Sequence, residues 1–232
     1  MRKLRPELVS LAVLGGVFLL ANAQAKNGID HKDLDLAKHG IPVVKPMKDA
    51  KTGFIVGGKN TTAVIRGLTH INDISIADLE RVMRPGKSSN AGFLGAKENL
   101  LDVLVADNDY VTEKLGLTHQ ELGRHLHAMG ALAKELAKSR PVAAGFVYHG
   151  RRYQVLREDT RGLQPSPFDD GTKSGSNVVV KNLGNGKEIR YGLLVPFMIE
   201  RYGFYEGKGT SYRVEPARVV EVFDFLKTTS KK

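Results

Sequence analysis

The sequence predicts an α+β fold, in which a helical N-terminal part packs against a C-terminal part that is rich in β-hairpins and ends in a helix. Between residues 73 and 140, apolar side chains recur at helical spacing. From residue 141 onward, short β-rich runs flank glycine-containing turns. Strands and helices do not alternate regularly, which argues against a doubly wound parallel sheet. Because no long linker separates them, we expect residues 41–140 and 141–226 to form one continuous domain.

The first 25 residues have the order of a secretory signal peptide. A basic start precedes an apolar run over residues 8–21, and small residues at Ala21, Ala23 and Ala25 offer A-x-A cleavage sites. The alternative is an uncleaved membrane anchor, but the run is shorter than the ~20 residues that a spanning helix needs. We therefore expect cleavage after export, a periplasmic or secreted protein, and no transmembrane segment afterwards.

Composition narrows the classes of partner and chemistry. The formal net charge is +10, which favours anionic neighbours such as envelope polymers, acidic lipid head groups, acidic proteins or nucleic acid. The alternative is that this positive charge only keeps the protein soluble. The chain has no cysteine, so disulfides, thiol catalysis and thiolate metal sites are excluded. An exported protein of this kind depends on its apolar core for stability.

In the N-terminal part, a polar stretch is followed by short runs of residues that favour β-strands. Residues 26–40 predict a flexible polar lead-in, and Ile41–Val44 predicts an edge strand, where Pro42 is tolerated. The runs 53–56 and 61–66 flank Gly57-Gly58-Lys59-Asn60 and predict a β-hairpin.

The same turn has the glycine and lysine spacing of a phosphate-binding loop, from Gly53 to Lys59. However, Asn60 stands where a magnesium-binding Ser or Thr is needed, and we expect no helix after it. A nucleotide site is therefore not expected.

Helices are predicted next. Ser75 caps a helix that ends near Met83, and a second helix covers residues 96–105, with Asn108 or Asp109 capping a further turn. Thr118-His119-Gln120-Glu121 is a capping box that opens a helix to about Lys138. Its predicted buried stripe is Leu122, Leu126, Met129, Ala133 and Leu136, with Gly123 and Gly130 allowing a close neighbour.

The helix that follows Thr118 also suggests two functional alternatives. Residues 115–122 look like the start of a DNA-binding helix-turn-helix, but the apolar stripe continues without the required turn. His125 and His127 lie two residues apart and point to different sides of a helix, so they do not favour a shared metal ion. We expect them on a polar helix face.

Two hairpins and two helices are predicted in the C-terminal part. Strands over 142–148 and 152–156 flank a turn at His149-Gly150-Arg151, and residues 162–177 are predicted to form a long loop. Strands over 177–181 and 187–195 flank a second glycine-rich turn. Pro196 begins a short helix that Gly203 ends. Pro216 begins a last helix with Val219, Val220, Phe223 and Leu226 as its apolar face, followed by a disordered tail at 227–232.

The catalytic candidates are the carboxylates of Asp169, Asp170, Glu200 and Glu206, because paired carboxylates serve as acid and base in sugar hydrolysis. His149 could join Ser166 and Asp169 in a hydrolytic triad, or bind a metal with Asp169 or Asp170. No nucleophile elbow occurs, and nothing in the spacing supports either arrangement. We expect no metal and no cofactor.

The ligand-binding candidates lie in an aromatic and basic segment over residues 201–213. Tyrosines there can stack on sugar rings or anchor a protein partner, and the neighbouring arginines can hold phosphate or carboxylate. The alternative is that these aromatic residues close the core. We expect Phe204 to be buried and at least one tyrosine to show its hydroxyl to a cavity or to solvent. The candidate residues are Arg201, Tyr202, Tyr205, Tyr212 and Arg213.

These observations predict an exported, non-catalytic binding module for an anionic envelope polymer or a protein partner. One alternative is an exported hydrolase that acts on a glycan or peptide through the carboxylates named above, at least one of which should have a raised pKa. A second alternative is a nucleic-acid binder, which requires a continuous basic stripe.

Overall fold

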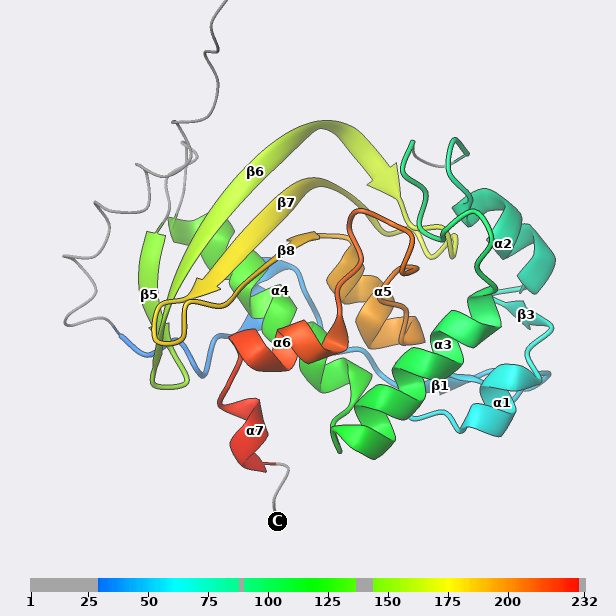
Figure 1. Ribbon diagram of the computed structural model, residues 1–232, viewed down its shortest axis with the longest axis horizontal. Coiled ribbons are helices and arrows are strands. Elements are labelled where there is room, and N and C mark those ends of the chain that lie inside the picture. Colours follow the sequence, from blue (N-terminus) through cyan, green and yellow to red (C-terminus); the bar gives the residue numbers. More distant parts are fainter. Residues whose placement is uncertain (1–28, 88–89, 137–143, 230–232) are drawn as a thin grey trace, which may run out of the picture.

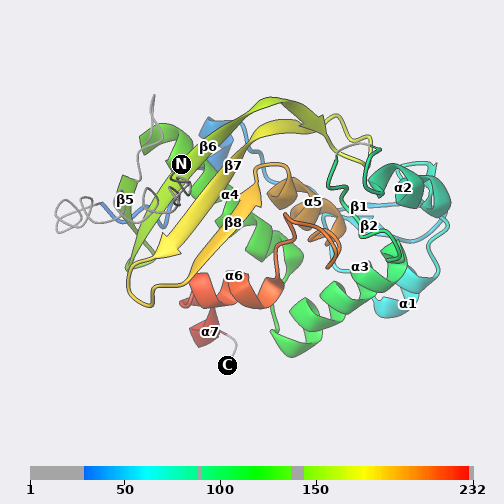
Figure 2. The same ribbon diagram turned by 45° about the horizontal axis from the view of Figure 1, so that its top comes forward.

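The computed structural model describes residues 29–87, 90–136 and 144–229 (Figure 1). A four-stranded antiparallel sheet in the order β5-β6-β7-β8 lies over a layer of helices, and the N-terminal helices lie beyond one end of the sheet (Figures 1 and 2). The predicted α+β class, with a helical N-terminal part and a hairpin-rich C-terminal part that ends in a helix, is confirmed. The predicted signal peptide at 1–25 lies outside the described residues.

The sheet contains both predicted C-terminal hairpins. The β5–β6 turn has positive φ at His149 and at Gly150, which suits the twist of a two-residue hairpin turn. The second hairpin joins β7 to β8. The strands are β5 (Ala144–Tyr148), β6 (Arg151–Pro165), β7 (Lys173–Asn182) and β8 (Glu188–Gly192).

The predicted loop over 162–177 is wrong, because β6 and β7 continue through most of it. Their pairing shifts register between Asp159 and Gln164 and then resumes from Gln164 opposite Ser174. Thr160 Oγ1 donates to the Gly175 carbonyl across this irregular stretch. The glycines and serines that suggested a loop instead form a bulged ribbon, which arches past the ends of β5 and β8 (Figure 2).

Helix α4 (His119–Leu136) is the central helix beneath the sheet. It begins at the predicted capping box, where Thr118 Oγ1 accepts a hydrogen bond from the Glu121 amide. The Tyr191 hydroxyl of β8 donates to the Leu126 carbonyl and ties the sheet to this helix. The predicted stripe is buried except for Leu136, which is 39% exposed, and the predicted helix end at Lys138 lies outside the described residues.

Two further helices complete this layer. Helix α5 (Val195–Tyr202) packs against α4 and ends at Gly203, whose φ of 67° closes the helix in the left-handed conformation. Helix α6 (Pro216–Val222) begins with proline in its first turn, as predicted. It stops at Val222, and a turn separates it from α7 (Leu226–Thr229), although the predicted apolar residues are all buried.

The N-terminal helices confirm one prediction and correct another. Ser75 caps α2 (Ile76–Met83), accepting from the Asp78 amide as expected. Helix α3 (Leu100–Asp109) starts later than predicted, at the cap Asn99, and continues without a break into the π-helical turn η4 (Tyr110–Lys114). Asn108 and Asp109 therefore do not cap a separate turn.

The predicted hairpin around residues 57–60 is wrong. The pairing strands are β1 (Met47–Lys48) and β2 (Ile55–Val56), while Thr61 caps a helix, α1 (Thr62–Arg66). The β-branched run suggested a strand, but the Thr61 side chain accepts from the Val64 amide and starts a helix instead. Asn60 bonds both the amide and the carbonyl of Ile55, so its side chain closes the turn.

The segments before and after this turn also differ from expectation. Residues 41–44 form no strand, and the Ile41 and Pro42 carbonyls accept from Arg124 of α4. A small pair, β3 (His70–Ile71) and β4 (Ile74–Ser75), precedes α2. In the predicted lead-in, Leu36 of the 3₁₀ turn η3 (Leu36–His39) is buried. None of the helices in the described residues has both the length and the apolar composition needed to cross a membrane.

Candidate functional site

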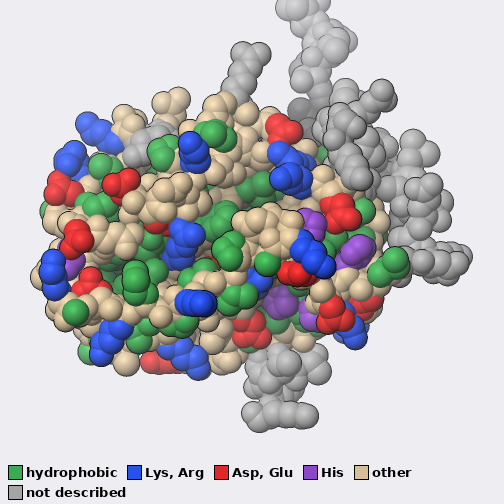
Figure 3. All heavy atoms as spheres, turned by 180° about the vertical axis from the view of Figure 1, so that it is seen from behind, with side chains coloured by type: hydrophobic (Ala, Val, Ile, Leu, Met, Phe, Trp, Pro, Cys, Tyr) green, Lys and Arg blue, Asp and Glu red, His purple; other side chains and the backbone are tan. Residues whose placement is uncertain are grey.

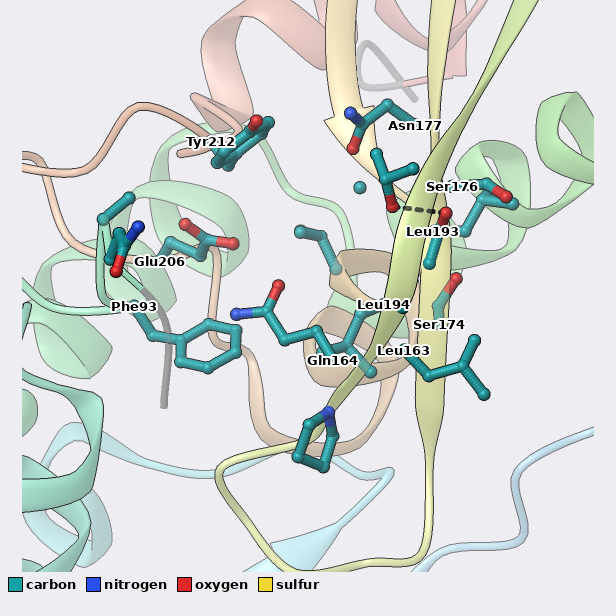
Figure 4. Close-up of a pocket in the computed structure, with 18 of the residues that line it drawn as sticks. Phe93, Leu163, Gln164, Ser174, Ser176, Asn177, Leu193, Leu194, Glu206 and Tyr212 are labelled. Carbon is teal, nitrogen blue, oxygen red and sulfur yellow. Dashed lines mark hydrogen bonds between the residues drawn. The ribbon is translucent and has the colours of Figure 1, made fainter. Parts of the chain in front are cut away.

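A cleft of about 550 Å³ opens beneath the arching β6–β7 ribbon. One wall comes from the end of β6, the start of β7 and the β8–α5 connection. The other wall comes from Gly92 and Phe93, between α2 and α3, and from Glu206 and Tyr212 in the loop after α5 (Figure 4). This volume falls within the ~300–1,000 Å³ of typical ligand pockets. The cleft is therefore the candidate site.

The ribbon wall is uncharged, and it carries polar groups beside the apolar side chains of Leu163 and Pro165. Gln164 and Pro165 line it from β6, and Ser174, Ser176 and Asn177 line it from β7. Hydroxyl and amide groups both donate and accept hydrogen bonds. Among the described residues that line the cleft, none is a lysine or an arginine, and Glu206 is the one with a carboxyl group.

Glu206 is the residue with the most unusual environment in the cleft. It is 4% exposed, and its φ of 67° lies in the left-handed region that side chains other than glycine seldom adopt. Thr210 Oγ1 donates to its Oε2 at 3.0 Å. Burial raises the pKa of Glu206 to about 8, although the Thr210 hydrogen bond and the Arg213 charge act in the opposite direction. At pH 7 the carboxyl group is therefore mostly protonated.

An ion pair fixes the backbone at Glu206. The Arg213 guanidinium donates to the Glu206 carbonyl and also bonds both carboxylate oxygens of Asp107 in α3, at 3.0 and 2.6 Å. Arg213 and Asp107 are each 5% exposed at their side chains. Burial raises the pKa of Asp107 despite the hydrogen bonds from Arg213.

Neighbouring contacts hold the loop on either side of Glu206. The Gly207 amide donates to the Phe93 carbonyl at 2.8 Å, and Glu98 accepts from the amides of Gly95 and Lys208. Before Glu206, the buried Tyr205 hydroxyl lies 3.0 Å from His119 Nδ1 of α4. Burial lowers the pKa of His119 to about 4, so this ring is neutral at pH 7. Contacts from α3, from α4 and from the segment between α2 and α3 therefore hold the loop around Glu206 in place.

Most of the predicted ligand-binding residues are engaged inside the protein. Arg201 donates to Asp170 and Thr172, at 2.7 and 2.6 Å. Tyr202 donates to Asp170 and is buried, as is Tyr205. Phe204 is fully buried, as expected. Arg213 supports Glu206 from behind, so Tyr212, which is half-buried, is the predicted binding residue that lines the cleft.

The structure separates the predicted catalytic carboxylates. Asp169 is exposed with a φ of 50°, in the turn between β6 and β7. Burial acts to raise the pKa of Asp170, but the hydrogen bond from Arg201 and the one from the Thr172 backbone together hold this pKa below its usual value. Glu200 is buried between α4 and α5, 3.3 Å from His127 Nε2 and 3.6 Å from Arg124. Glu206 is the one that lines the cleft.

The alternative triad of His149, Ser166 and Asp169, which the sequence did not support, is not assembled. His149 lies in the β5–β6 turn and stacks on Phe225, whereas Ser166 follows the opposite end of the 15-residue strand β6. Within the described residues, no group of three or more His, Asp or Glu side chains could hold a metal ion.

The histidines of α4 are not on a polar face, which corrects that prediction. His127 is buried against Glu200, and burial lowers its pKa. His125 lies among Tyr148, His149, Phe223 and Phe225, and burial lowers its pKa to about 4. The spacing of these histidines was visible in the sequence, but it did not show that α5 covers His127 or that β5 and the turn after α6 cover His125.

Sequence reasoning missed the polar wall of the cleft. Strand β7 is polar from Lys173 to Asn177 and apolar from Val178 to Val180. Such a change of composition along one strand indicates that its first half faces a polar surface and its second half faces the core. No family model, curated protein or solved structure matches this chain.

Proposed function

We propose that this protein binds an uncharged chain rich in hydroxyl and amide groups, a glycan strand, in the cleft beneath the β6–β7 ribbon. The observation that carries the proposal is the lining of the cleft. Its described polar residues carry amides and hydroxyls, and its carboxyl group at Glu206 is mostly protonated at neutral pH. Sugar hydroxyls also donate and accept hydrogen bonds, so such a wall complements them.

An uncharged ligand suits this cleft better than the anionic polymer predicted from composition. Arg201 and Arg213, which were expected to hold anions, pair with Asp170 and Asp107 within the protein. On the face opposite to that of Figure 1, lysines and arginines are spread among acidic side chains (Figure 3). This face therefore offers no continuous basic stripe, which the nucleic-acid alternative needs.

A glycan suits the cleft better than a protein partner. Protein interfaces depend on clustered apolar or aromatic anchors. Of the large apolar side chains that are exposed among the described residues, Ile29, Val43, Met47 and Leu136 lie outside the cleft and Leu163 lines it, so the cleft offers one such anchor and no cluster. We propose export as the setting for this binding. A mature N-terminus after Ala23 or Ala25, measured by mass spectrometry of the exported protein, would agree with it.

The binding proposal is tested with immobilised neutral oligomers of N-acetylglucosamine and with an anionic polysaccharide, each at low and high salt. We expect retention on the neutral oligomers that salt does not abolish, because no lysine or arginine among the described lining residues contributes. Tyr212→Ala and Gln164→Ala should weaken retention, whereas Tyr110→Ala, a half-buried tyrosine outside the cleft, should not. Retention only on the anionic polymer, lost at high salt, would contradict the proposal.

A further inference from the structure

Resting on the proposed glycan binding, we propose that Glu206 is a general acid that cleaves a glycosidic bond of an N-acetylated amino-sugar chain, with the acetamido group of the substrate as nucleophile. The protein would then be an enzyme that uses one carboxyl group of its own. This activity goes beyond binding, and it names the class of substrate.

The placement of the carboxyl group is the first support. Thr210 engages Oε2 of Glu206, and among the described residues none donates a hydrogen bond to Oε1. Figure 4 shows the carboxyl of Glu206 and the amide of Gln164 directed into the same open space. A proton donor must lie within hydrogen-bond reach of the atom that it protonates, and a ligand in this cleft would meet that carboxyl group.

The support around Glu206 is the second argument. A positive φ at a non-glycine residue is unfavourable and persists where neighbouring contacts over-determine it. Here the contacts are the Arg213–Asp107 ion pair, the Gly207–Phe93 bond and the Glu98 contacts. These contacts hold Glu206 in one position at the cleft wall, as a proton donor requires.

The protonation state agrees with this role. With a pKa of about 8, Glu206 holds its proton at neutral pH and can donate it. The titratable or charged groups that surround the loop from the elements packed against it are Glu98, Asp107, His119, Tyr205, Lys208, Tyr212, Arg213 and Glu215. Of these, Arg213 lowers the pKa of Glu206, and burial outweighs it.

The number of carboxyl groups selects the type of cleavage. Glycosidases that use a carboxylate nucleophile place a second carboxyl group about 5–5.5 Å from the acid. No second carboxyl group occurs among the described residues that line the cleft. Where the enzyme lacks that nucleophile, the acetamido group of the substrate can replace it. This requirement restricts the substrate to N-acetylated amino sugars.

Water is the one co-reactant that this cleavage needs. The Glu206 proton moves to the glycosidic oxygen, the C1–O bond breaks with its electron pair going to that oxygen, and the acetamido oxygen bonds to C1. Water then attacks C1, the bond from the acetamido oxygen breaks, and the water proton passes to the Glu206 carboxylate. The products are one free alcohol and one new reducing end, with the enzyme in its starting state.

The experiment measures new reducing ends from N-acetylglucosamine oligomers incubated with the full protein, from pH 5 to pH 10. We expect cleavage that declines above about pH 8, as Glu206 loses its proton. Glu206→Gln should lower the rate by about 10²–10⁴-fold while binding stays within a few-fold. Glu188→Gln, an exposed carboxyl of β8 outside the cleft, is the matched control and should cleave normally. Glucosamine oligomers without acetyl groups should not be cleaved.

The outcomes separate the two proposals. Binding without cleavage by the wild type, or full activity of Glu206→Gln, overturns the inference and leaves the glycan-binding proposal standing. Equal cleavage of the deacetylated oligomers overturns the role of the acetamido group. Failure to bind any neutral oligomer overturns both proposals. If Glu206→Gln does not fold, as judged by circular dichroism, the wild-type pH profile decides, and a rate that does not decline between pH 7 and pH 10 contradicts the role of Glu206.

Discussion

At the scale of single residues, Glu206 links the stability of the fold to pH. Its ordinary pKa is 4.5, and its pKa in the folded protein is about 8. Between these values the folded state keeps a proton that the unfolded chain releases. The contribution of Glu206 is therefore complete below pH 4.5 and is lost as the pH rises through 8. The free energy of unfolding should fall by up to about 1.4 kcal/mol per pH unit across this range.

Urea unfolding of the wild type and of Glu206→Gln, from pH 5 to pH 9, measures this effect. The amide that replaces the carboxyl group does not ionise, so the variant should lose stability less steeply with rising pH. Comparison with Glu188→Gln controls for the loss of one carboxyl group at the surface. Parallel stability curves for the wild type and Glu206→Gln would show that the carboxyl group has an ordinary pKa.

At the scale of elements, the contact between α4 and α5 depends on a glycine. A Cβ atom at Gly123 would lie 2.5 Å from Glu200 Cγ and 3.1 Å from the Pro196 carbonyl oxygen, which belongs to the backbone. At Gly130 the nearest atom would be Leu193 Cδ2, the end of a flexible side chain, at 2.6 Å. The two glycines on one helix therefore face neighbours of different rigidity.

We expect Gly123→Ala to lower the free energy of unfolding by about 1–3 kcal/mol, because overcrowding at the backbone outweighs the better helix propensity of alanine. Gly130→Ala should leave stability unchanged or raise it, since Leu193 can move. Thermal unfolding of both variants makes the comparison. If Gly123→Ala were as stable as Gly130→Ala, the two helices would not be in close contact at Gly123.

Elements with local start and stop signals could be predicted from sequence, and elements defined by distant partners could not. Ser75, Thr118 and Gly203 each mark a helix end through a contact with the adjacent backbone. The bulged ribbon of β6 and β7 depends on pairing between strands, so its glycines looked like a loop. Thr61 caps α1 within a β-branched run that is equally typical of a strand.

The candidate site was only partly predictable for the same reason. Glu206 and Tyr212 were named from their sequence context, and both line the cleft. Burial decides which carboxyl group keeps its proton, and the loop of Glu206 is held against α3 and against the segment between α2 and α3, which are distant in sequence. Arg213 was expected to hold a ligand because its true partner could not be recognised in the sequence. That partner, Asp107, lies 106 positions away.

At the scale of the whole molecule, one apolar core joins both halves of the chain. It extends from Phe54 and Leu79 in the N-terminal part to Val180 and Phe223 in the C-terminal part. A shared core predicts that the two parts unfold together. Circular dichroism and tyrosine fluorescence, which is observable because the chain has no tryptophan, should give coincident transitions in urea. Two separate midpoints would show that 41–140 and 141–226 are independent domains.

The ion pair between Asp107 and Arg213 also sets an order of events during synthesis. The chain leaves the ribosome from its N-terminus, so α3 and the polar wall on β6 and β7 emerge before the loop that carries Glu206 and Arg213. Until Arg213 is available, Asp107 has no guanidinium partner, and closing so long a segment is slow. A nascent chain that ends at β8 has the ribbon but lacks the acid, so the complete cleft forms only when the last part of the chain has been made.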